Sequence, residues 1–438
     1  MSLPLLHAGR TNPGLSAALD LRFALDKSLT AYRGPTPSFS RASTGSYFNS
    51  SGVLTSASIN APRFNHTYNG TSWVSRGLLV EEQRTNLATN SELFSNASWT
   101  KYESSVTANA QTSPDGTNSG FKFIPSANGT LHYLYMNPAM AANTSYTCSV
   151  FAKKAEYKYL QIGLIYNPTS DCGAQFDLDA GTVTRQSGQS AGYTAANAII
   201  TNVGNGWFRC SVTLSAGRSD MALNITGSNT LWTSGPSYLS FTGDGTSGIY
   251  LWGAQMELGA FPTSYIPATT ATTRSADVCQ ITGTSFSSFW NASEGSIAFQ
   301  FDLIPPASVT GTGSSPSLIS FTDPSNNQRF FYDADTTPRT RFYVDDLSTS
   351  SSVYVNENVW GQTAQKAAYC YKVNDLASCL NGGTVQTDTS QNLPTGIDRM
   401  SIGYNAAYGA NGRMNGHISR LRYYPTRLTN AQLQSLST

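Results

Sequence analysis

The sequence GLLVEEQRTN, at residues 77–86, marks the end of one folding unit and the start of the next. Three apolar residues at 78–80 run directly into Glu81 and Glu82, and Arg84 follows. An apolar run that ends so abruptly in charge is typical of a buried strand leaving a core. We therefore expect a strand here that lies at a junction between modules.

A second unusual stretch, IYLWGAQMELGAFPTSYIPATTATTRSAD, lies at residues 249–277. It begins as an apolar strand at 249–252 and ends in a linker of Pro, Ala and Thr. The two stretches predict the limits of one folded module and connect that module to its neighbours. We interpret Glu81, Glu82 and Arg84 as junction charges that pair with Arg274 or Arg76, in preference to a catalytic role.

The composition of the 438 residues favours a folded chain with a largely uncharged surface. Hydrophobic residues make up 39% and aromatic residues 11%, enough for the cores of about two to four domains. Charged residues reach only 12%, about half of the usual ~25%. A surface that relies on hydroxyl and amide groups suits all-β domains and neutral hydrogen-bonding partners such as sugars.

The charge pattern argues against several classes of partner. The net charge is +1 and no run of Lys or Arg occurs, so we expect no nucleic-acid binding. No apolar run approaches about 18 residues, so we expect no membrane insertion. The apolar core of residues 1–10 is too short for a secretory signal, which predicts synthesis and folding in a cytoplasm.

Short strand patterns separated by turns recur along the whole chain, and no long helical period interrupts them. In the first 76 residues, LDLRFAL at 19–25 alternates as a half-buried strand and Asn69-Gly70 predicts a hairpin turn. Strands are predicted in the middle module at 120–124, 131–136, 145–152, 159–165, 174–178, 181–185, 207–214, 221–225, 238–242 and 248–252. In the last module they are predicted at 295–303, 329–332, 340–344, 352–355, 365–372, 377–380, 399–402 and 412–424. One short helix is expected at 429–436, with Thr429 as its N-cap.

Six cysteines are scattered along the chain, at 148, 172, 210, 279, 370 and 379. None forms a CxxC pair and the four histidines are far apart, which argues against zinc. Cys370 and Cys379 flank a predicted turn and could face each other across a hairpin as a disulfide. Cytoplasmic folding favours the alternative, two reduced and buried thiols.

Four segments together resemble the head spike fibre and tail fibre modules of tailed bacteriophages. They are GLLVEEQRTNL (77–87), NSELFSNASW (90–99), NGWFRCSV (205–212) and the stretch at 249–277. The segment SFSRASTGSYFNSSGVLTSASINAPRF (38–64) resembles the N-terminal part that such proteins carry. The middle module is also similar to carbohydrate-binding jelly rolls, in which an Asn-rich loop leads to a Phe and then a Trp, here Phe94 and Trp99.

The last third resembles a laminin-G/concanavalin-A-like lectin domain, through Trp360, CLNGG (379–383), MSIGYN (400–405) and the closing stretch 415–436. The resemblances imply an all-β chain of tandem antiparallel β-sandwiches, a jelly roll followed by a concanavalin-A-like domain, after a β-rich N-terminal segment. The expected limits are 1–90 for a virion-attachment segment, 91–266 for the jelly roll, 267–278 for a linker and 279–438 for the lectin domain.

The resemblances also imply a function: a non-enzymatic fibre or spike on the surface of a phage virion that binds host cell-surface glycans during adsorption. The implied partners are host surface polysaccharide, other virion proteins bound through the N-terminal segment, and two further copies in a homotrimer. Two alternatives stay open, a capsule or lipopolysaccharide depolymerase and a purely structural capsid decoration protein.

No catalytic constellation is evident in the sequence. Glycoside hydrolysis needs two carboxylates flanking the scissile bond, and the concanavalin-A-like glucanases carry both Glu on one strand. The last module has only Glu294 and Glu357, and neither lies in such a cluster. No GxSxG, HExxH or P-loop motif with suitable surroundings occurs. We therefore expect no catalytic residues and no enzyme activity.

Two sets of ligand residues are predicted. Related jelly rolls often hold a structural calcium, so the oxygen donors considered are Glu257, Asp177, Asp179 and Asp244, although no clustered acidic loop supports them. Glycan binding needs aromatic faces for sugar C–H groups and polar side chains for hydroxyls. The residues predicted to supply these are Tyr133, Tyr135, Tyr157, Tyr159, Trp232, Tyr332, Tyr343, Tyr404, Asn405, Tyr408 and Asn411. Four tryptophans flanked by apolar strands, at 99, 207, 252 and 360, are expected in cores.

Overall fold

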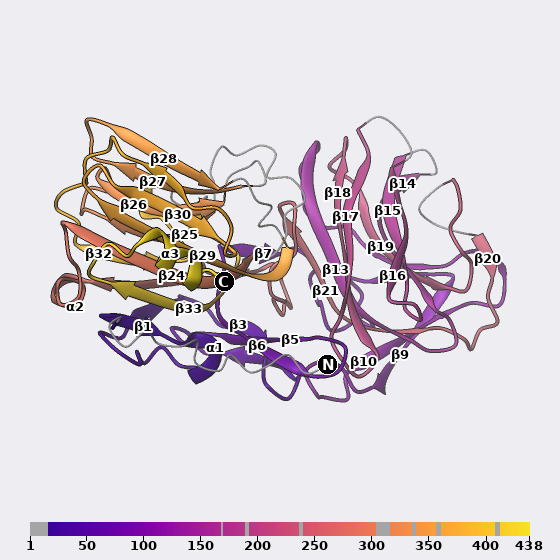
Figure 1. The fold of residues 1–438 in the computed structure, drawn as a ribbon. Coiled ribbons are helices and arrows are strands. Elements are labelled where there is room, and N and C mark those ends of the chain that lie inside the picture. Colours follow the sequence, from indigo (N-terminus) through magenta and orange to yellow (C-terminus); the bar gives the residue numbers. More distant parts are fainter. Residues whose placement is uncertain are drawn as a thin grey trace.

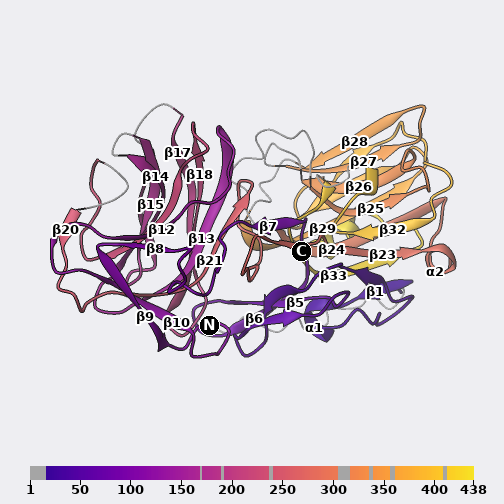
Figure 2. The ribbon, with the colours of Figure 1, turned by 180° about the vertical axis from the view of Figure 1, so that it is seen from behind.

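The chain forms two β-rich lobes that lie side by side in the computed structural model (Figure 1; Figure 2 shows the back). The structure describes residues 16–167, 170–188, 192–235, 240–303, 316–334, 339–355, 361–407 and 412–438. One lobe contains the middle of the chain, and the other combines strands from the beginning and the end. The predicted all-β class, built from antiparallel β-sandwiches, is confirmed.

The middle lobe is a sandwich of two six-stranded antiparallel sheets. The first sheet, here called the inner sheet because it faces the other lobe, has the order β17 (Thr194–Asn202), β18 (Trp207–Ala216), β13 (Thr144–Lys154), β21 (Ile249–Leu258), β10 (Gly120–Pro125) and β9 (Ser104–Gln111). The second, the outer sheet, has the order β16 (Thr182–Gly188), β15 (Ser170–Asp177), β14 (Tyr159–Asn167), β19 (Ala222–Ser228), β12 (Tyr133–Met136) and β8 (Thr100–Tyr102). Alternate residues of both sheets meet in one core that contains Trp99, Phe123 and Leu251.

The second lobe is a sandwich built from both ends of the chain. Its eight-stranded sheet has the order β31 (Gln386–Asp388), β30 (Leu376–Leu380), β29 (Gly361–Lys372), β24 (Glu294–Leu303), β33 (Gly416–Tyr424), β6 (Trp73–Val80) and β5 (Phe64–Tyr68), and β1 (Leu19–Leu21) also pairs with β33. Its seven-stranded sheet has the order β2 (Ser38–Ser40), β23 (Val278–Thr282), β32 (Arg399–Ile402), β25 (Ser317–Thr322), β26 (Arg329–Ala334), β27 (Thr340–Asp345) and β28 (Ser350–Val355).

Three two-stranded ribbons and three short helices complete the described elements. The ribbons are β3 (Gly45–Phe48) with β4 (Leu54–Ala57), β7 (Arg84–Asn86) with β22 (Thr272–Arg274), and β11 (Gly129–Leu131) with β20 (Ser240–Thr242). The helices are α1 (Phe23–Asp26), α2 (Gly283–Ser287) and α3 (Asn430–Leu436). Helix α3 confirms the sequence prediction, since Thr429 caps it and forms a capping box with Gln432.

The N-terminal segment does not form a unit of its own, in contrast to the expected boundary at residue 90. Strand β1 pairs with β33, β2 pairs with β23, and β6 pairs with β33, so these N-terminal strands belong to the same sheets as the C-terminal third. The predicted strand at 19–25 also ends early, because the chain turns at Arg22 into the one-turn helix α1. This turn buries Phe23 in the shared core.

Most of the predicted strands are present in the structure. The longest strands that were not predicted are β9, β17 and β25. Two of them, SSVTANAQ and TAANAIITN, are rich in Ser, Thr, Ala and Asn, so the alternation of apolar and polar residues is weak. The hairpin predicted at Asn69-Gly70 is confirmed, since β5 and β6 pair on either side of it.

The two stretches that bracket the middle module lie next to each other. Strand β6 is buried over its last four residues, 77–80, as predicted. The chain then leaves the second lobe through β7 and returns through β22, and these two strands pair with Asn86 opposite Thr272. The middle sandwich is therefore inserted into the other sandwich through one antiparallel pair of connections.

A buried cluster of five charged side chains fills the junction. Arg63 donates to Glu81 at 2.7 Å and to Asp277 at 2.5 Å. Arg41 also donates to Asp277, at 3.1 Å, and Arg274 lies 3.5 Å from Glu81. The prediction that Glu81 pairs with Arg274 at a junction is confirmed, whereas Arg76 pairs with Asp302 and Arg84 with Glu82.

An aromatic cluster forms the apolar part of the same junction. Phe48 of the β3–β4 hairpin contacts Trp73 and also Phe151 of the inner sheet, with ring centroids 5.0 and 6.4 Å apart. Gly52 in the hairpin turn has a φ of +79°, and a Cβ there would lie 2.1 Å from the Trp73 indole nitrogen. Only glycine fits this position, because both the backbone conformation and the contact exclude a side chain.

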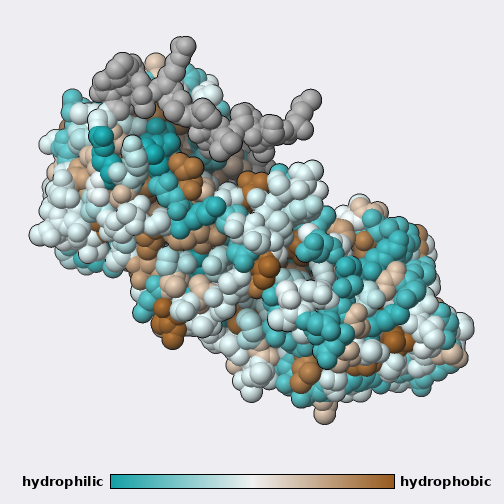
Figure 3. All heavy atoms as spheres, turned by 90° about the horizontal axis from the view of Figure 1, so that it is seen from below, coloured by the Kyte–Doolittle hydropathy of each residue, from teal (hydrophilic) through white to brown (hydrophobic). Residues whose placement is uncertain are grey.

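The surface matches the composition. Figure 3 shows hydrophobic residues on the visible face as small separate areas among hydrophilic and intermediate ones. No helix in the described part of the chain is long and apolar enough to cross a membrane. All six cysteines are buried as free thiols, and in the β29–β30 pairing Cys370 lies opposite Ala377 while Cys379 lies opposite Ala368. The disulfide alternative for Cys370 and Cys379 is therefore not formed.

Candidate functional site

The side chains on the face of the outer sheet that points away from the core define the candidate site. Residues that pair directly in an antiparallel sheet point to the same face. Tyr133 pairs with Tyr102, and Tyr135 pairs with Thr100 on one side and Asn224 on the other. The intervening residue, Leu134, is fully buried in the core. The three tyrosines and Asn224 therefore share the face that points away from the core.

The three tyrosines form a continuous aromatic surface, here called the tyrosine platform (Tyr102, Tyr133 and Tyr135). The rings of Tyr102 and Tyr133 stack with centroids 4.9 Å apart and planes at 10°. Tyr135 continues the row, 5.7 Å from Tyr133. Tyr102 is 43% exposed, although large aromatic side chains are normally better covered. Burial raises the pKa of Tyr133, so its hydroxyl stays protonated and can donate a hydrogen bond at neutral pH.

Two buried polar side chains beside the platform lack partners within the described part of the chain. Both atoms of the Asn224 amide and the hydroxyl of Thr226 make no hydrogen bond, and both residues are almost fully buried. They lie two residues apart on β19 and share the outer face. A buried amide without a partner is unfavourable by about 1–3 kcal/mol, so such groups usually bind water or a ligand.

The other aromatic residues predicted in the middle module are enclosed. Trp232 is only 2% exposed: its backbone amide donates to Gln175 at 2.9 Å, and the Arg185 guanidinium covers its ring. Tyr157 and Tyr159 are also buried. None of the three offers a free ring face comparable with that of Tyr102.

The residues predicted in the last module do not form one site. Tyr332 is fully buried in the core, where its hydroxyl donates to Thr340 at 2.6 Å. Tyr404 is buried and donates to Gln280 at 2.9 Å, and Asn405 is buried beside it. Tyr343 is half-buried against Phe331 on the solvent side of β27. Tyr408 and Asn411 lie outside the described residues, as does Trp360, whereas the other three tryptophans predicted in cores are buried.

The four predicted calcium donors do not gather into one site, and each is engaged in other contacts. The Glu257 carboxylate accepts hydrogen bonds from the backbone and side chain of Thr263 at 2.8 and 2.7 Å. Asp177 and Asp244 accept backbone hydrogen bonds within their own turns, and Asp179 pairs with Lys154. Among the described residues, no three His, Cys, Asp or Glu side chains come close enough to hold a metal ion.

Sequence reasoning found two members of the platform and missed the third. Tyr133 and Tyr135 alternate with apolar residues in a recognisable strand. Tyr102 lies on a three-residue edge strand, and only the pairing of β8 with β12 places it against Tyr133. Asn224 carries no local signal either, since NIT within β19 reads as an ordinary strand.

Comparisons with known proteins give only distant likenesses. No family model matches the chain, and no curated protein matches it in sequence. Similar solved structures include the Ruminococcus gnavus IT-sialidase CBM40 bound to alpha2,3 sialyllactose (14% identity, 34% of this chain, 84% of that chain, TM-score 0.29). Others are a heptameric SAP-like pentraxin from Limulus polyphemus (11%, 34%, 70%, 0.27) and the LG1-3 region of the laminin alpha2 chain (10%, 69%, 66%, 0.26).

Scores this low carry no argument about site or activity. The sheets of the chain itself establish its class: it is an all-β protein made of two antiparallel β-sandwiches, one inserted into the other.

Proposed function

We propose that this chain is a non-enzymatic glycan-binding protein and that the tyrosine platform of its middle sandwich holds the sugar. The observation that carries the proposal is the juxtaposition of three tyrosine rings, one of them 43% exposed, with the unpartnered amide of Asn224 across the β12–β19 pair. Aromatic faces cover the C–H surface of a sugar ring, and a few fixed polar groups orient its hydroxyls.

The chemistry of the platform suits a neutral sugar. Phenol hydroxyls both donate and accept hydrogen bonds, and the Asn224 side chain has one acceptor oxygen and two amide hydrogens to offer. A ligand hydroxyl that reaches Asn224 would relieve the unfavourable burial of that amide. Binding would then gain more from this one contact than from an equivalent contact at an exposed side chain.

In its biological setting, we propose that the chain is a fibre or spike on the surface of a bacteriophage virion and that it adsorbs to host cell-surface polysaccharide. The support is the sequence resemblance of residues 38–64, 77–87, 90–99, 205–212 and 249–277 to phage fibre modules. A homotrimer and attachment to other virion proteins are parts of the same proposal. The absence from the sequence of a paired-carboxylate motif supports a binding role over depolymerisation.

The test measures the binding of purified host capsule or lipopolysaccharide to the native chain. The same measurement is then made on variants of the tyrosine platform. Tyr102→Ala is expected to weaken binding about tenfold, because it removes the exposed ring. Tyr166→Ala is the matched control, since Tyr166 is 50% exposed on β14 but stacks under Arg218, away from the platform. Equal losses in both variants, or no saturable binding by the native chain, would contradict the proposal.

A second variant separates binding from stability. Asn224→Leu is expected to leave the free energy of unfolding unchanged or higher, because the amide has no partner to lose, while glycan binding weakens. A structural role for Asn224 predicts the reverse, a loss of stability with binding retained. An assay for new reducing ends on the bound polysaccharide tests the proposal that the chain is not an enzyme. Sustained release of reducing ends would disprove that proposal.

A further inference from the structure

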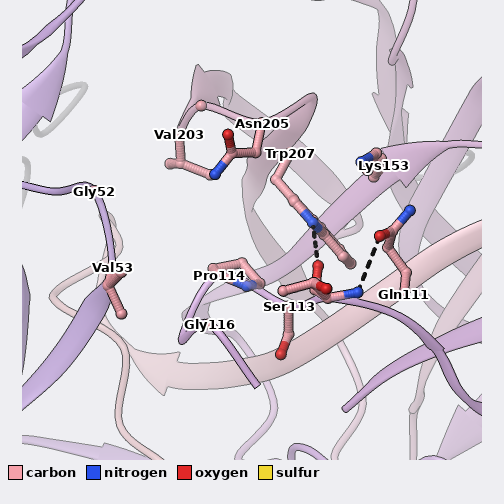
Figure 4. A pocket seen from close by; sticks show the side chains of 12 residues that line it. Gly52, Val53, Gln111, Ser113, Pro114, Gly116, Lys153, Val203, Asn205 and Trp207 are labelled. Carbon is pink, nitrogen blue, oxygen red and sulfur yellow. Dashed lines mark hydrogen bonds between the residues drawn. The ribbon is translucent and has the colours of Figure 1, made fainter. Parts of the chain in front are cut away.

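A cavity of about 160 Å³ lies between the β3–β4 hairpin and the middle sandwich, apart from the tyrosine platform (Figure 4). Three segments distant in sequence line it: the hairpin turn at 52–53, the segment 111–116, and the turn 203–207. One side chain of strand β13, Lys153, completes the lining. The cavity is therefore formed only when the N-terminal hairpin is docked on the middle sandwich.

Hydrogen bonds fix the walls of this cavity. The backbone amide of Leu54 donates to the carbonyl of Pro114 at 2.9 Å, which attaches the hairpin to the middle sandwich. The indole nitrogen of Trp207 donates to the carbonyl of Thr112 at 2.9 Å, as the dashed line in Figure 4 shows. The site is thus preformed, so a ligand would not have to order a loop in order to bind.

The polar groups that line the cavity favour an anion that also carries hydroxyls. Among the described residues, Lys153 forms no ion pair, whereas its neighbour Lys154 pairs with Asp179 at 2.6 Å. The side chain of Gln111 accepts a hydrogen bond from Thr112 with its oxygen, which leaves its amide hydrogens available. Asn205 is exposed in the turn and contributes a second amide, seen at the top of Figure 4.

Apolar groups supply the rest of the surface. Val53, Pro114, Val203 and the edge of Trp207 face the cavity alongside these polar groups. With about 160 Å³ the cavity is comparable in size with cavities of about 150 Å³ that hold one six-membered ring, so it has room for a single sugar ring. One cation, two amides and an apolar wall match one carboxylate, several hydroxyls and the C–H face of a pyranose ring.

We propose that this cavity is a second ligand site, which binds one carboxylate-bearing sugar residue of the hexuronate type through Lys153. The ammonium group of Lys153 pairs with the carboxylate, and Gln111 and Asn205 donate to ring hydroxyls. Because the hairpin turn forms one wall, the bound residue also contacts both lobes and strengthens their association.

The experiment titrates the full chain with free glucuronate and follows amide NMR shifts at residues 203–207, with glucose as the neutral probe. Glucuronate is expected to bind at least about tenfold more tightly than glucose, since glucose cannot form the charged contact. Lys153→Met keeps the length of the side chain and is expected to abolish this preference, whereas Lys153→Arg retains it. Lys154→Met is the matched control, because it removes the adjacent charge and leaves the cavity unchanged.

The possible results separate clearly. No shifts at about 50 mM glucuronate, equal affinity for glucose, or an equal loss in Lys154→Met would each overturn the proposal. Asn205→Gly is a second variant, which removes an amide that donates to the ring hydroxyls. The turn tolerates glycine here because Asn205 has a φ of +53°. Tyr102→Ala is expected to leave glucuronate binding intact, so failure at this cavity and failure of the tyrosine platform are distinguishable.

Discussion

At the scale of single residues, the junction depends on charges that have no contact with water. Glu81 is fully buried and accepts hydrogen bonds from the backbone amide and the hydroxyl of Ser264, at 2.7 and 2.6 Å. Burial alone would raise the pKa of Glu81, but Arg274, Arg63 and the hydrogen bonds from Ser264 together hold this pKa well below its usual range. The carboxylate thus connects a residue of the middle sandwich to arginines on both sides of the junction.

Replacing Glu81 by Gln is expected to destabilise the chain by about 3–5 kcal/mol, because the buried Arg63 and Arg274 lose a charged partner. Chemical denaturation followed by tryptophan fluorescence measures the effect. Glu82→Gln is the control: Glu82 is partly exposed and pairs with Arg84, so about 1 kcal/mol or less is expected. Similar losses in the two variants would contradict the assignment.

The same substitution changes the response to acid. A carboxylate whose pKa is lower in the folded than in the unfolded state stabilises the fold above the unfolded value, about 4.3, and this stabilisation is lost as the pH falls toward the folded value. The free energy of unfolding of the native chain is therefore expected to decrease below about pH 5. In Glu81→Gln, the free energy of unfolding should fall less steeply as the pH is lowered.

At the scale of elements, local sequence signals and tertiary packing agree at the C-terminus. Helix α3 has seven residues, too few to be stable alone, yet Leu433 packs into a small core with Cys379 and Leu428. The N-cap oxygen of Thr429 accepts from the Gln432 backbone amide, and the Gln432 side chain accepts from the Thr429 amide. The helix therefore covers one face of β29 and β30 in the eight-stranded sheet only with both contributions.

Thr429→Ala is expected to lower the free energy of unfolding by about 1 kcal/mol, because the cap hydrogen bond is lost. Thr429→Ser, which keeps the hydroxyl, should stay close to the native value. Hydrogen exchange of the amides of β30, which contacts α3, localises the effect. Unchanged stability in Thr429→Ala would show that packing alone holds the helix.

At the scale of the whole molecule, one sandwich interrupts the other. Strands β1, β2, β5 and β6 precede the middle lobe in sequence, and the rest of the second lobe follows it. The connections leave and return side by side, with Asn86 opposite Thr272. The middle sandwich and the second lobe each have a hydrophobic core of their own. A unit with its own core can fold alone, so we expect each lobe to fold independently once all of its chain segments are present.

Excision of residues 87–271 provides the test. Joining Asn86 to Thr272 through an Asn-Gly turn should close a hairpin and yield a folded second lobe, since the two residues already pair. The fragment 279–438 alone should not unfold cooperatively, because β33 and β23 lose the N-terminal strands that pair with them. Circular dichroism and thermal unfolding of the two shortened chains decide the point, and a stable isolated fragment would disprove the shared sandwich.

Prediction from sequence succeeded where the signal is local. Alternating side chains marked most strands, Asn69-Gly70 marked a hairpin, and the apolar flanks of Trp99 and Trp252 marked core positions. It failed where the partner is distant. The pairing of Leu19 with Tyr423 and that of Tyr102 with Tyr133 depend on sheet order, which no window of sequence contains. Of the predicted glycan residues, Tyr133 and Tyr135 lie together, while Trp232 and Tyr332 are enclosed.

The sequence by itself determined the all-β class, the positions of many turns and strands, and the structural character of Glu81, because these follow from side-chain period, turn chemistry and charge. Only the tertiary structure decided that the two ends of the chain build one sandwich, that Tyr102 joins the platform, and that a hairpin closes the Lys153 cavity. The reason is physical: alternation fixes which face a residue occupies, whereas packing and hydrogen-bond register between distant strands fix which residues meet there.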